Sequence, residues 1–343
     1  MKSSHHARTN DSIFAFTALI LFGLVYAGAA TVDDRPAQQA EAPDIPTIDI
    51  GRDVHGSIVR MPLVGSGTWQ YNDTIAYQSL CKAFAAGSTF VDTAFGYQNE
   101  HGVRNALADC YTGRREDLFV LTKVPGGLTR AQTLDAHHQN MFLLNLEYVD
   151  HLMTHFPADW KQTHASKHER QEEWRALEEI YYSGKARSIG ISHYCPQHIH
   201  DILEIATVMP SINQVEYHVG SQDIDGVIDT CREHGITFMS FSPLCGPCEF
   251  EPKDSLINGD LVASMGMKYN VTGAQVALRF IVQQALKPGS FIGGVIPKSN
   301  NVKHIQQNMD LFSFELSKED MDLLGKATKP GAEGGDCGVP FDN

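Results

Sequence analysis

Short apolar runs alternate with helix-like stretches along most of the chain. The runs are LVGSG, TFVDT, LFVLT, DHLMTH, RSIGIS, INQVEY, ITFMSFS and FIGGVIP. Strands that alternate with helices predict a parallel sheet with right-handed crossovers. Eight such units favour closure into a single (β/α)₈ barrel of the TIM type over an open sheet, which makes the chain an α/β protein.

The ends of the pattern divide the chain into segments. TIDI and SIVR predict a small N-terminal hairpin before the barrel, and Thr129 with Gln132 predicts a capping box before the third helix. The Gly-rich stretch at the end of the sequence predicts a short C-terminal extension. There is no G-x-G-x-x-G, so a Rossmann domain is not indicated. The expected segments are 1–29 as a signal peptide or membrane anchor, 30–46 as a linker, 47–330 as the barrel and 331–343 as an irregular tail.

Composition fits one globular enzyme-sized domain. The chain has 343 residues, of which 42% are hydrophobic and 20% charged, with a net charge of −14. This acidic balance argues against a nucleic-acid partner. We expect a monomer.

The N-terminus has the pattern of a secretory signal. MKSSHHARTNDS carries Lys2 and Arg8, and the apolar run IFAFTALILFGLVYAG leads to small residues at Ala27 and Ala29. The predicted location is therefore the secretory pathway or the extracellular space. The alternative is an uncleaved membrane anchor, and only then would the protein contact a membrane.

Seven scattered cysteines do not predict a disulfide framework in a chain of this size, and buried single thiols are expected. Cys245 and Cys248 form a C-x-x-C without thioredoxin-like surroundings, which leaves open a disulfide or paired thiols on one hand and inert thiols on the other. A single C-x-x-C is weak evidence for zinc, so no metal is expected. His198 and His200 are expected on the surface.

Four polar residues stand at or just after the ends of apolar runs: Asp92, Tyr97, Lys123 and His155. In a barrel these strand ends meet at the catalytic mouth. An ammonium beside a phenol stabilises phenolate, so Lys123 is expected to lower the pKa of Tyr97 towards the operating pH. The set predicts a proton-transfer site.

The ordered segments GSGTW, DTAFGYQNEHGVRNAL, LTKVP, MTHFP, RSIGISHY, INQVEYH, SFSPL and VIPKS resemble the aldo-keto reductase family across about residues 45–330. The resemblance implies a barrel that binds NADPH in extended form at its C-terminal face, with NADH possible, and reduces aldehydes and ketones. A small-molecule carbonyl compound is the implied substrate.

The resemblance also implies residue roles. Tyr97 would donate the proton, Lys123 and Asp92 would tune it, and His155 would orient the carbonyl. Trp69 and Phe156 would line the substrate pocket. The implied cofactor contacts are Gly67, Thr68, Ser192, His193, Gln214, Phe241, Ser242, Leu244, Lys298, Ser299, His304 and Asn308.

Two of these positions depart from the family pattern. His193 stands where the family has Asn, and neutral His still offers one donor and one acceptor, with a possible pH dependence. His304 stands where an Arg often grips the 2′-phosphate, so NADPH preference should be weaker than is typical. The alternative functions are a non-catalytic NADP(H)-binding sensor or regulatory subunit, and a thiol–disulfide protein that uses Cys245 and Cys248.

Overall fold

The structure is a computed structural model, and it describes residues 44–159, 166–221, 223, 225–244 and 256–327. The expected signal segment, most of the linker, the Cys245–Cys248 motif and the Gly-rich tail lie outside the described residues.

Eight parallel strands form one curled sheet, which confirms the predicted barrel. Neighbouring strands pair in chain order from β3 to β10. Val64 forms a parallel bridge with Val295, and Gly65 N donates to Val295 O at 2.8 Å, so the last strand closes on the first. The strands are β3 (Ser66–Gly67), β4 (Phe90–Asp92), β5 (Phe119–Val124), β6 (His151–Thr154), β7 (Ile189–Ser192), β8 (Ile212–Glu216), β9 (Thr237–Phe241) and β10 (Ile292–Val295).

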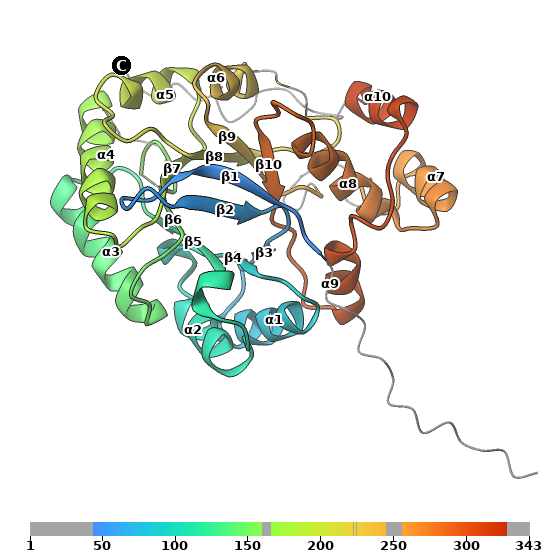
Figure 1. Ribbon diagram of the computed structural model, residues 1–343, viewed down its shortest axis with the longest axis horizontal. Coiled ribbons are helices and arrows are strands. Elements are labelled where there is room, and N and C mark those ends of the chain that lie inside the picture. Colours follow the sequence, from blue (N-terminus) through green and yellow to red (C-terminus); the bar gives the residue numbers. More distant parts are fainter. Residues whose placement is uncertain (1–43, 160–165, 222, 224, 245–255, 328–343) are drawn as a thin grey trace, which may run out of the picture. The chain divides into compact units, whose positions relative to one another are not determined.

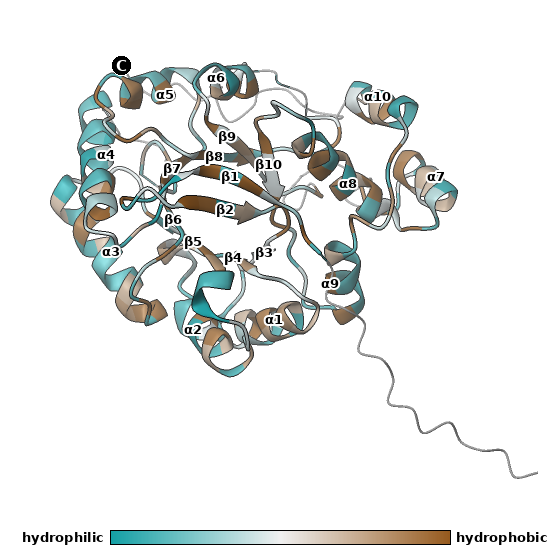
Figure 2. Cartoon of the chain, viewed as in Figure 1, coloured by the Kyte–Doolittle hydropathy of each residue, from teal (hydrophilic) through white to brown (hydrophobic). Residues whose placement is uncertain are grey.

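Helices surround the strands (Figure 1). Their polar faces turn outward, while the strands are mostly hydrophobic (Figure 2). The helices are α1 (Asp73–Ala85), α2 (Glu100–Asp109), α3 (Arg130–Leu144), α4 (Lys167–Tyr182), α5 (Pro196–Leu203), α6 (Val227–Glu233), α7 (Asp260–Tyr269), α8 (Gly273–Ala285), α9 (Val302–Met309) and α10 (Lys318–Lys326), with short 3₁₀ helices η1 (Phe95–Tyr97) and η2 (Arg115–Asp117).

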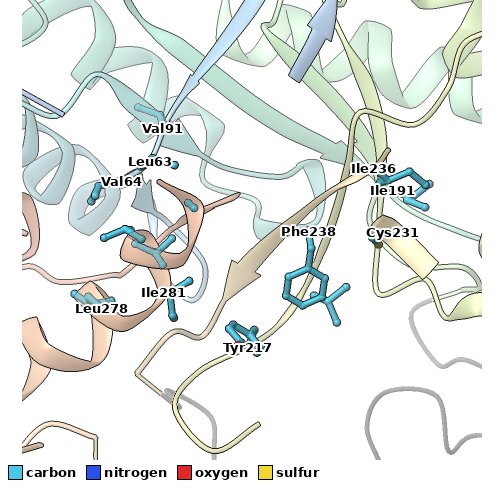
Figure 3. Packing of buried hydrophobic residues seen from close by; sticks show 14 of the residues in the cluster. Leu63, Val64, Val91, Ile191, Tyr217, Cys231, Ile236, Phe238, Leu278 and Ile281 are labelled. Atoms are coloured by element: carbon cyan, nitrogen blue, oxygen red, sulfur yellow. The ribbon is translucent and has the colours of Figure 1, made fainter. Parts of the chain in front are cut away.

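Two hydrophobic cores hold the barrel. One lies between strands and helices, and Figure 3 shows part of it around Phe238, Tyr217 and Ile281. The other fills the barrel interior and includes Met61 and Val59 from the predicted hairpin, which is formed by β1 (Thr47–Arg52) and β2 (Ile58–Pro62). The hairpin side chains therefore complete the core inside the barrel, and the polar residues at the C-terminal strand ends remain available for a site.

Local signals in the sequence set the helix boundaries. Thr129 accepts from the backbone N–H of Gln132, and the Gln132 side chain accepts from Thr129 N, which is the predicted capping box. Gly184 follows α4 with φ +75°, a backbone conformation that costs a residue with Cβ more than it costs glycine.

The cysteine prediction was wrong for Cys81 and Cys110, which form a disulfide with a Cα–Cα distance of 5.1 Å. The sequence separation of 29 residues hid this pair, because only the packing of α1 on α2 brings the two residues together. Closing a loop of this length stabilises the fold by about 3–4 kcal/mol in the chain-entropy model. Cys195 is also disulfide-bonded, while Cys231 is a buried free thiol.

The histidines of α5 separate into two classes. His200 is exposed as expected, but His198 is only 1% exposed, so its predicted surface position was wrong. The Cys195 N–H donates to His198 Nδ1 at 3.3 Å, and this contact turns the ring inward at the start of the helix.

Within the described residues, no helix combines the length and the apolar character that crossing a bilayer requires.

Candidate active site

A buried ion pair joins the ends of two neighbouring strands. Lys123, on β5, places Nζ 2.8 and 2.9 Å from the two carboxylate oxygens of Asp92, on β4. Both side chains are almost completely buried, so the attraction acts in a medium of low polarity. Lys123 Nζ also donates to Thr93 O at 3.2 Å, which helps to fix the ammonium in place.

Tyr97 meets this pair from the short helix η1, which follows β4. Lys123 Nζ lies 3.1 Å from the phenol oxygen. His155, just after β6, places its ring edge-on to Tyr97, with 5.4 Å between the centroids. Three strands therefore bring the four predicted residues into one cluster.

The direction of the phenol pKa differs from the sequence prediction. Burial and the negative charge of Asp92 raise the pKa of Tyr97 well above its ordinary value. Lys123 does not reverse this effect because its ammonium is held by the Asp92 carboxylate at short distance. Burial also lowers the pKa of Lys123, an effect that the Asp92 charge opposes. Tyr97 is therefore a protonated hydrogen-bond donor at neutral pH.

Burial lowers the pKa of His155 well below its usual value, and the charges of Lys123 and His193 act in the same direction. The imidazole of His155 is therefore neutral at neutral pH. A neutral imidazole carries one N–H, so it can donate one hydrogen bond to a molecule in the site.

The cluster opens into a cavity of about 390 Å³ at the C-terminal ends of the strands. Its wall is largely apolar and aromatic, with a few polar side chains, a composition typical of small-molecule sites. The residues that the sequence placed in the site and that line this cavity are Gly67, Trp69, Asp92, Tyr97, His155, Phe156, His193, Gln214, Phe241, Ser242, Leu244 and Lys298.

Four rings form a continuous row along one side of the cavity. His155 stacks on Phe156 with 4.5 Å between centroids, Phe156 lies 4.4 Å from His193, and His193 lies 4.6 Å from Phe241. The row extends from the end of β6 to the end of β9. His193 is thus held between two phenyl rings, which fixes the plane of its imidazole.

Hydrogen bonds determine the tautomer of His193. Its Nδ1 lies 3.1 Å from the His155 carbonyl oxygen, which can only accept, and 2.9 Å from Ser192 Oγ. Ser192 Oγ donates to Gln214 O at 2.9 Å, so it is also an acceptor for His193. Nδ1 must therefore carry the proton, and Nε2 is left as a hydrogen-bond acceptor.

Gln214 links the cavity wall to the ion pair. Its Nε2 donates to Asp92 Oδ2 at 2.9 Å, and its side chain is buried in the middle of β8. Asp92 thus accepts three side-chain hydrogen bonds, two from Lys123 and one from Gln214. A carboxylate with these partners is well satisfied in spite of its burial.

Lys298, after β10, reaches across the cavity rim. Its Nζ donates to Trp69 O and Gln70 Oε1, each at 2.9 Å, and lies 4.9 Å from the ring centroid of Tyr71. Partial burial lowers its pKa. The ammonium thus links the segment that follows β10 to the segment that follows β3, the two strands at which the barrel closes.

The other predicted contacts lie outside this cavity. Thr68 is buried and donates to Asp92 O at 2.9 Å, and Ser192 is buried behind His193. Ser299 and Asn308 line a separate hollow of about 10 Å³, and His304 is exposed on the first turn of α9. The structure brings Asp92, Tyr97, Lys123 and His155 together. Ser299, His304 and Asn308 lie outside the cavity.

Five lining residues were not predicted. Glu216 could have been found, because it is two residues after Gln214 on one strand and so faces the same side. The others lie within two residues of a predicted residue and carry no chemical signal of their own. The missed residues are Gln70, Glu216, Pro243, Ile296 and Pro297.

Backbone strain gathers around the cavity. Gln70, His193 and Ser242 line it with φ values of +63°, +61° and +47°, and Gln98 follows Tyr97 with φ +54°. Non-glycine residues adopt this region rarely, and such residues cluster at functional sites. The surrounding structure therefore holds the strand ends in a specific shape.

Fold and site together define a (β/α)₈ barrel with a carboxylate, an ammonium, a phenol and an imidazole gathered at its C-terminal face. The Aldo/keto reductase family model matches residues 63–329. A 9,11-endoperoxide prostaglandin H2 reductase of Trypanosoma cruzi (strain CL Brener) is 31% identical, with 82% of this chain and 93% of that protein covered. A glyoxal reductase of Bacillus subtilis (strain 168) is 32% identical, with 79% and 90% covered.

Solved structures agree. An aldo-keto reductase of Bombyx mori in complex with NADP has a TM-score of 0.70 and 26% identity, and 82% of this chain and 92% of that chain are covered. The chain therefore belongs to the aldo/keto reductase family, and it is an aldo-keto reductase by fold and by its relatives.

A test follows from the environment of His193. Burial lowers its pKa to about 4, although the His155 carbonyl and Glu216 favour the charged form. The ring should therefore stay neutral, with the proton on Nδ1, from about pH 8 down to about pH 5.5. With the ring neutral throughout, cofactor binding through His193 should not change over this pH range. Imidazole nitrogen shifts, assigned by comparison with His193→Asn, measure it, and a titration midpoint near pH 6.5 would contradict the buried geometry.

Proposed function

We propose that this protein reduces aldehydes or ketones to alcohols with a nicotinamide cofactor, and that NADPH is preferred. One observation carries the proposal: a buried Lys123–Asp92 pair holds the phenol of Tyr97 at the base of an aromatic-lined cavity. A hydroxyl fixed in this way can meet an oxygen atom that gains negative charge. Supporting the choice of cofactor, a related structure contains NADP.

The residues present fit such a cofactor. Phe241 offers a ring face for the nicotinamide, and His193 Nε2 offers an acceptor for its carboxamide N–H. Gln214, on β8, lines the same cavity. Lys298 supplies a cation at the rim for a phosphate group. Ser299, His304 and Asn308 lie outside the cavity and would contact the adenosine end of the cofactor.

Tyr97 is proposed as the proton donor. When bound, the cofactor supplies a hydride to the carbonyl carbon. Negative charge then develops on the carbonyl oxygen, and a protonated phenol within reach stabilises it and transfers its proton. The raised pKa keeps the Tyr97 phenol protonated at neutral pH. Proton transfer remains favourable because an alkoxide is a stronger base than a phenolate.

Lys123 and Asp92 keep the donor in place. The ammonium lies 3.1 Å from the phenol oxygen and would stabilise the phenolate after proton transfer. Asp92 holds that ammonium through both carboxylate oxygens. The neutral His155 would donate a second hydrogen bond to the substrate oxygen.

The substrate would lie against Trp69 and Phe156. Trp69 is 37% exposed, so part of the site is open, and compounds with an apolar or planar body fit this wall. The relatives include proteins named for glyoxal, D-xylose and a prostaglandin endoperoxide, so substrate choice varies widely among them.

The proton-donor role is tested with Tyr97→Phe. This change keeps the ring and removes the hydroxyl, so it should lower kcat for a model aldehyde by roughly 10²- to 10⁴-fold. The Kd for NADPH, measured by fluorescence quenching, should stay within about twofold because the ring remains. Near wild-type turnover would move proton donation elsewhere, with His155 next in line. NADPH binding by the wild type without turnover of any carbonyl compound would favour a sensor or regulatory role.

Cofactor preference is tested at Lys298. Lys298→Met removes the cation and should weaken NADPH binding by roughly 10- to 100-fold, because charge-assisted bonds to phosphate are strong. NADH binding should change by less than about threefold. The exposed Lys185, which lies outside the cavity, provides a charge-matched control as Lys185→Met. Equal losses for both cofactors would show that Lys298 does not select the extra phosphate.

We also propose that the mature protein resides in an oxidising compartment and that its N-terminal segment directs it there. The Cys81–Cys110 disulfide supports this, because disulfides persist in secreted proteins and are rare in the cytosol. The basic start and the apolar run point the same way.

N-terminal sequencing of protein from its native host decides the location. The mature chain should begin near Ala30 or Thr31. A membrane-bound chain that keeps Met1 would support the anchor instead. Intact Met1 in a soluble cytosolic fraction, with Cys81 and Cys110 reduced, would reject both.

A further inference from the structure

The loop at residues 298–301 connects β10 to α9 and carries Lys298 and Ser299. If the proposed function is correct, this loop holds the adenosine side of the cofactor. Its position should therefore set cofactor affinity.

Helix α1 holds this loop from outside the barrel. Ser79 Oγ donates to Ser299 O at 2.7 Å. Lys82 Nζ donates to the backbone oxygen of Asn300 at 2.8 Å and to its side-chain oxygen at 2.7 Å. Three hydrogen bonds thus join one helix face to two successive loop residues.

Lys82 also contributes charge. Among the described residues its ammonium forms no ion pair, and its hydrogen-bond acceptors in the loop are neutral oxygens. Lys298 and Lys303 stand on the same segment of the chain as Asn300, which Lys82 contacts. Positive charge along this segment attracts a phosphate-bearing ligand.

Helix α1 also packs against α2, its neighbour on the outside of the barrel (Figure 1). Ser79 and Lys82 are three residues apart and so share a face, whereas Cys81 points to a different one. Cys81 is bonded to Cys110, which directly follows α2. Phe84 and Tyr111 add an edge-to-face contact at 5.2 Å. The helix lies between the disulfide and the loop.

We propose that Ser79 and Lys82 are positioning residues for the cofactor loop, and that the Cys81–Cys110 disulfide holds α1 so that they can act. Cofactor affinity then depends on the redox state of this disulfide. A dithiol reductant breaks the S–S bond and supplies two electrons and two protons, giving two thiols and its own disulfide. The freed end of α1 can shift, and the loop loses its fixed position.

Lys82→Met tests the positioning role. The Kd for NADPH, measured by fluorescence quenching, should rise roughly 5- to 20-fold, since the variant loses two of the three hydrogen bonds to the loop and one positive charge. Because Lys82 does not touch the reacting atoms, kcat at saturating NADPH should stay within about twofold. Lys82→Arg keeps two donors and the charge, so it should restore most of the affinity. Lys185→Met is the charge-matched control and should leave the Kd unchanged.

The double variant Cys81→Ala/Cys110→Ala tests the disulfide without reducing any other. Its Kd for NADPH should rise roughly 3- to 10-fold. Combining it with Lys82→Met should give a loss smaller than the product of the two separate losses, because both changes act through the same loop. Thermal unfolding of each variant before titration confirms that it is folded at the temperature used.

The outcomes separate this inference from the proposed function. A wild type that fails to bind NADPH overturns both. A wild type that binds, with Lys82→Met equal to Lys185→Met, overturns only the positioning role. Losses that multiply independently overturn the link between the disulfide and the loop.

Discussion

The buried ion pair between Asp92 and Lys123 is the interaction on which the site depends. Removing water from two charges is costly, and removing one partner of such a pair costs about 3–5 kcal/mol because the other charge remains buried. The pair is tolerable here because Asp92 also accepts from Gln214, and Lys123 also donates to Thr93 O. The parallel register of β4 and β5 brings the two side chains together at the mouth. The pairing of these two strands thus fixes the position of the Lys123 ammonium next to the phenol of Tyr97.

Much of the fold could be predicted from the sequence because its signals are local. Alternating strands and helices, the capping box at Thr129 and the glycine after α4 each depend on a few neighbouring residues. The meeting of Asp92, Lys123 and His155 could also be predicted, since parallel strands end at the same edge of a barrel. Two features were missed. The Cys81–Cys110 bond needs the packing of two helices. The inward position of the His198 ring includes a bond from the backbone N–H of Cys195, three residues earlier, which the residue types alone do not indicate.

The pKa of Tyr97 shows a different limit. Counting charges along the sequence places an ammonium beside a phenol and predicts a lowered pKa. The structure places the carboxylate of Asp92 on the same ammonium, buries this pair and partly buries the phenol. Burial then dominates, and the pKa rises. Composition and order cannot supply this result, because desolvation depends on what packs around the site.

The residues proposed for chemistry and those proposed for cofactor binding stand on different kinds of structure. The ion pair and phenol stand on strand ends and on the short helix that follows β4, inside a closed barrel with a packed interior. Lys298, Ser299 and Asn300 stand on a connecting segment and need support from Trp69 O and from α1. Loops adapt more readily than strands, so cofactor affinity can change while proton-transfer geometry stays constant. A disulfide next to the supporting helix acts on the adaptable part and leaves the charged cluster untouched.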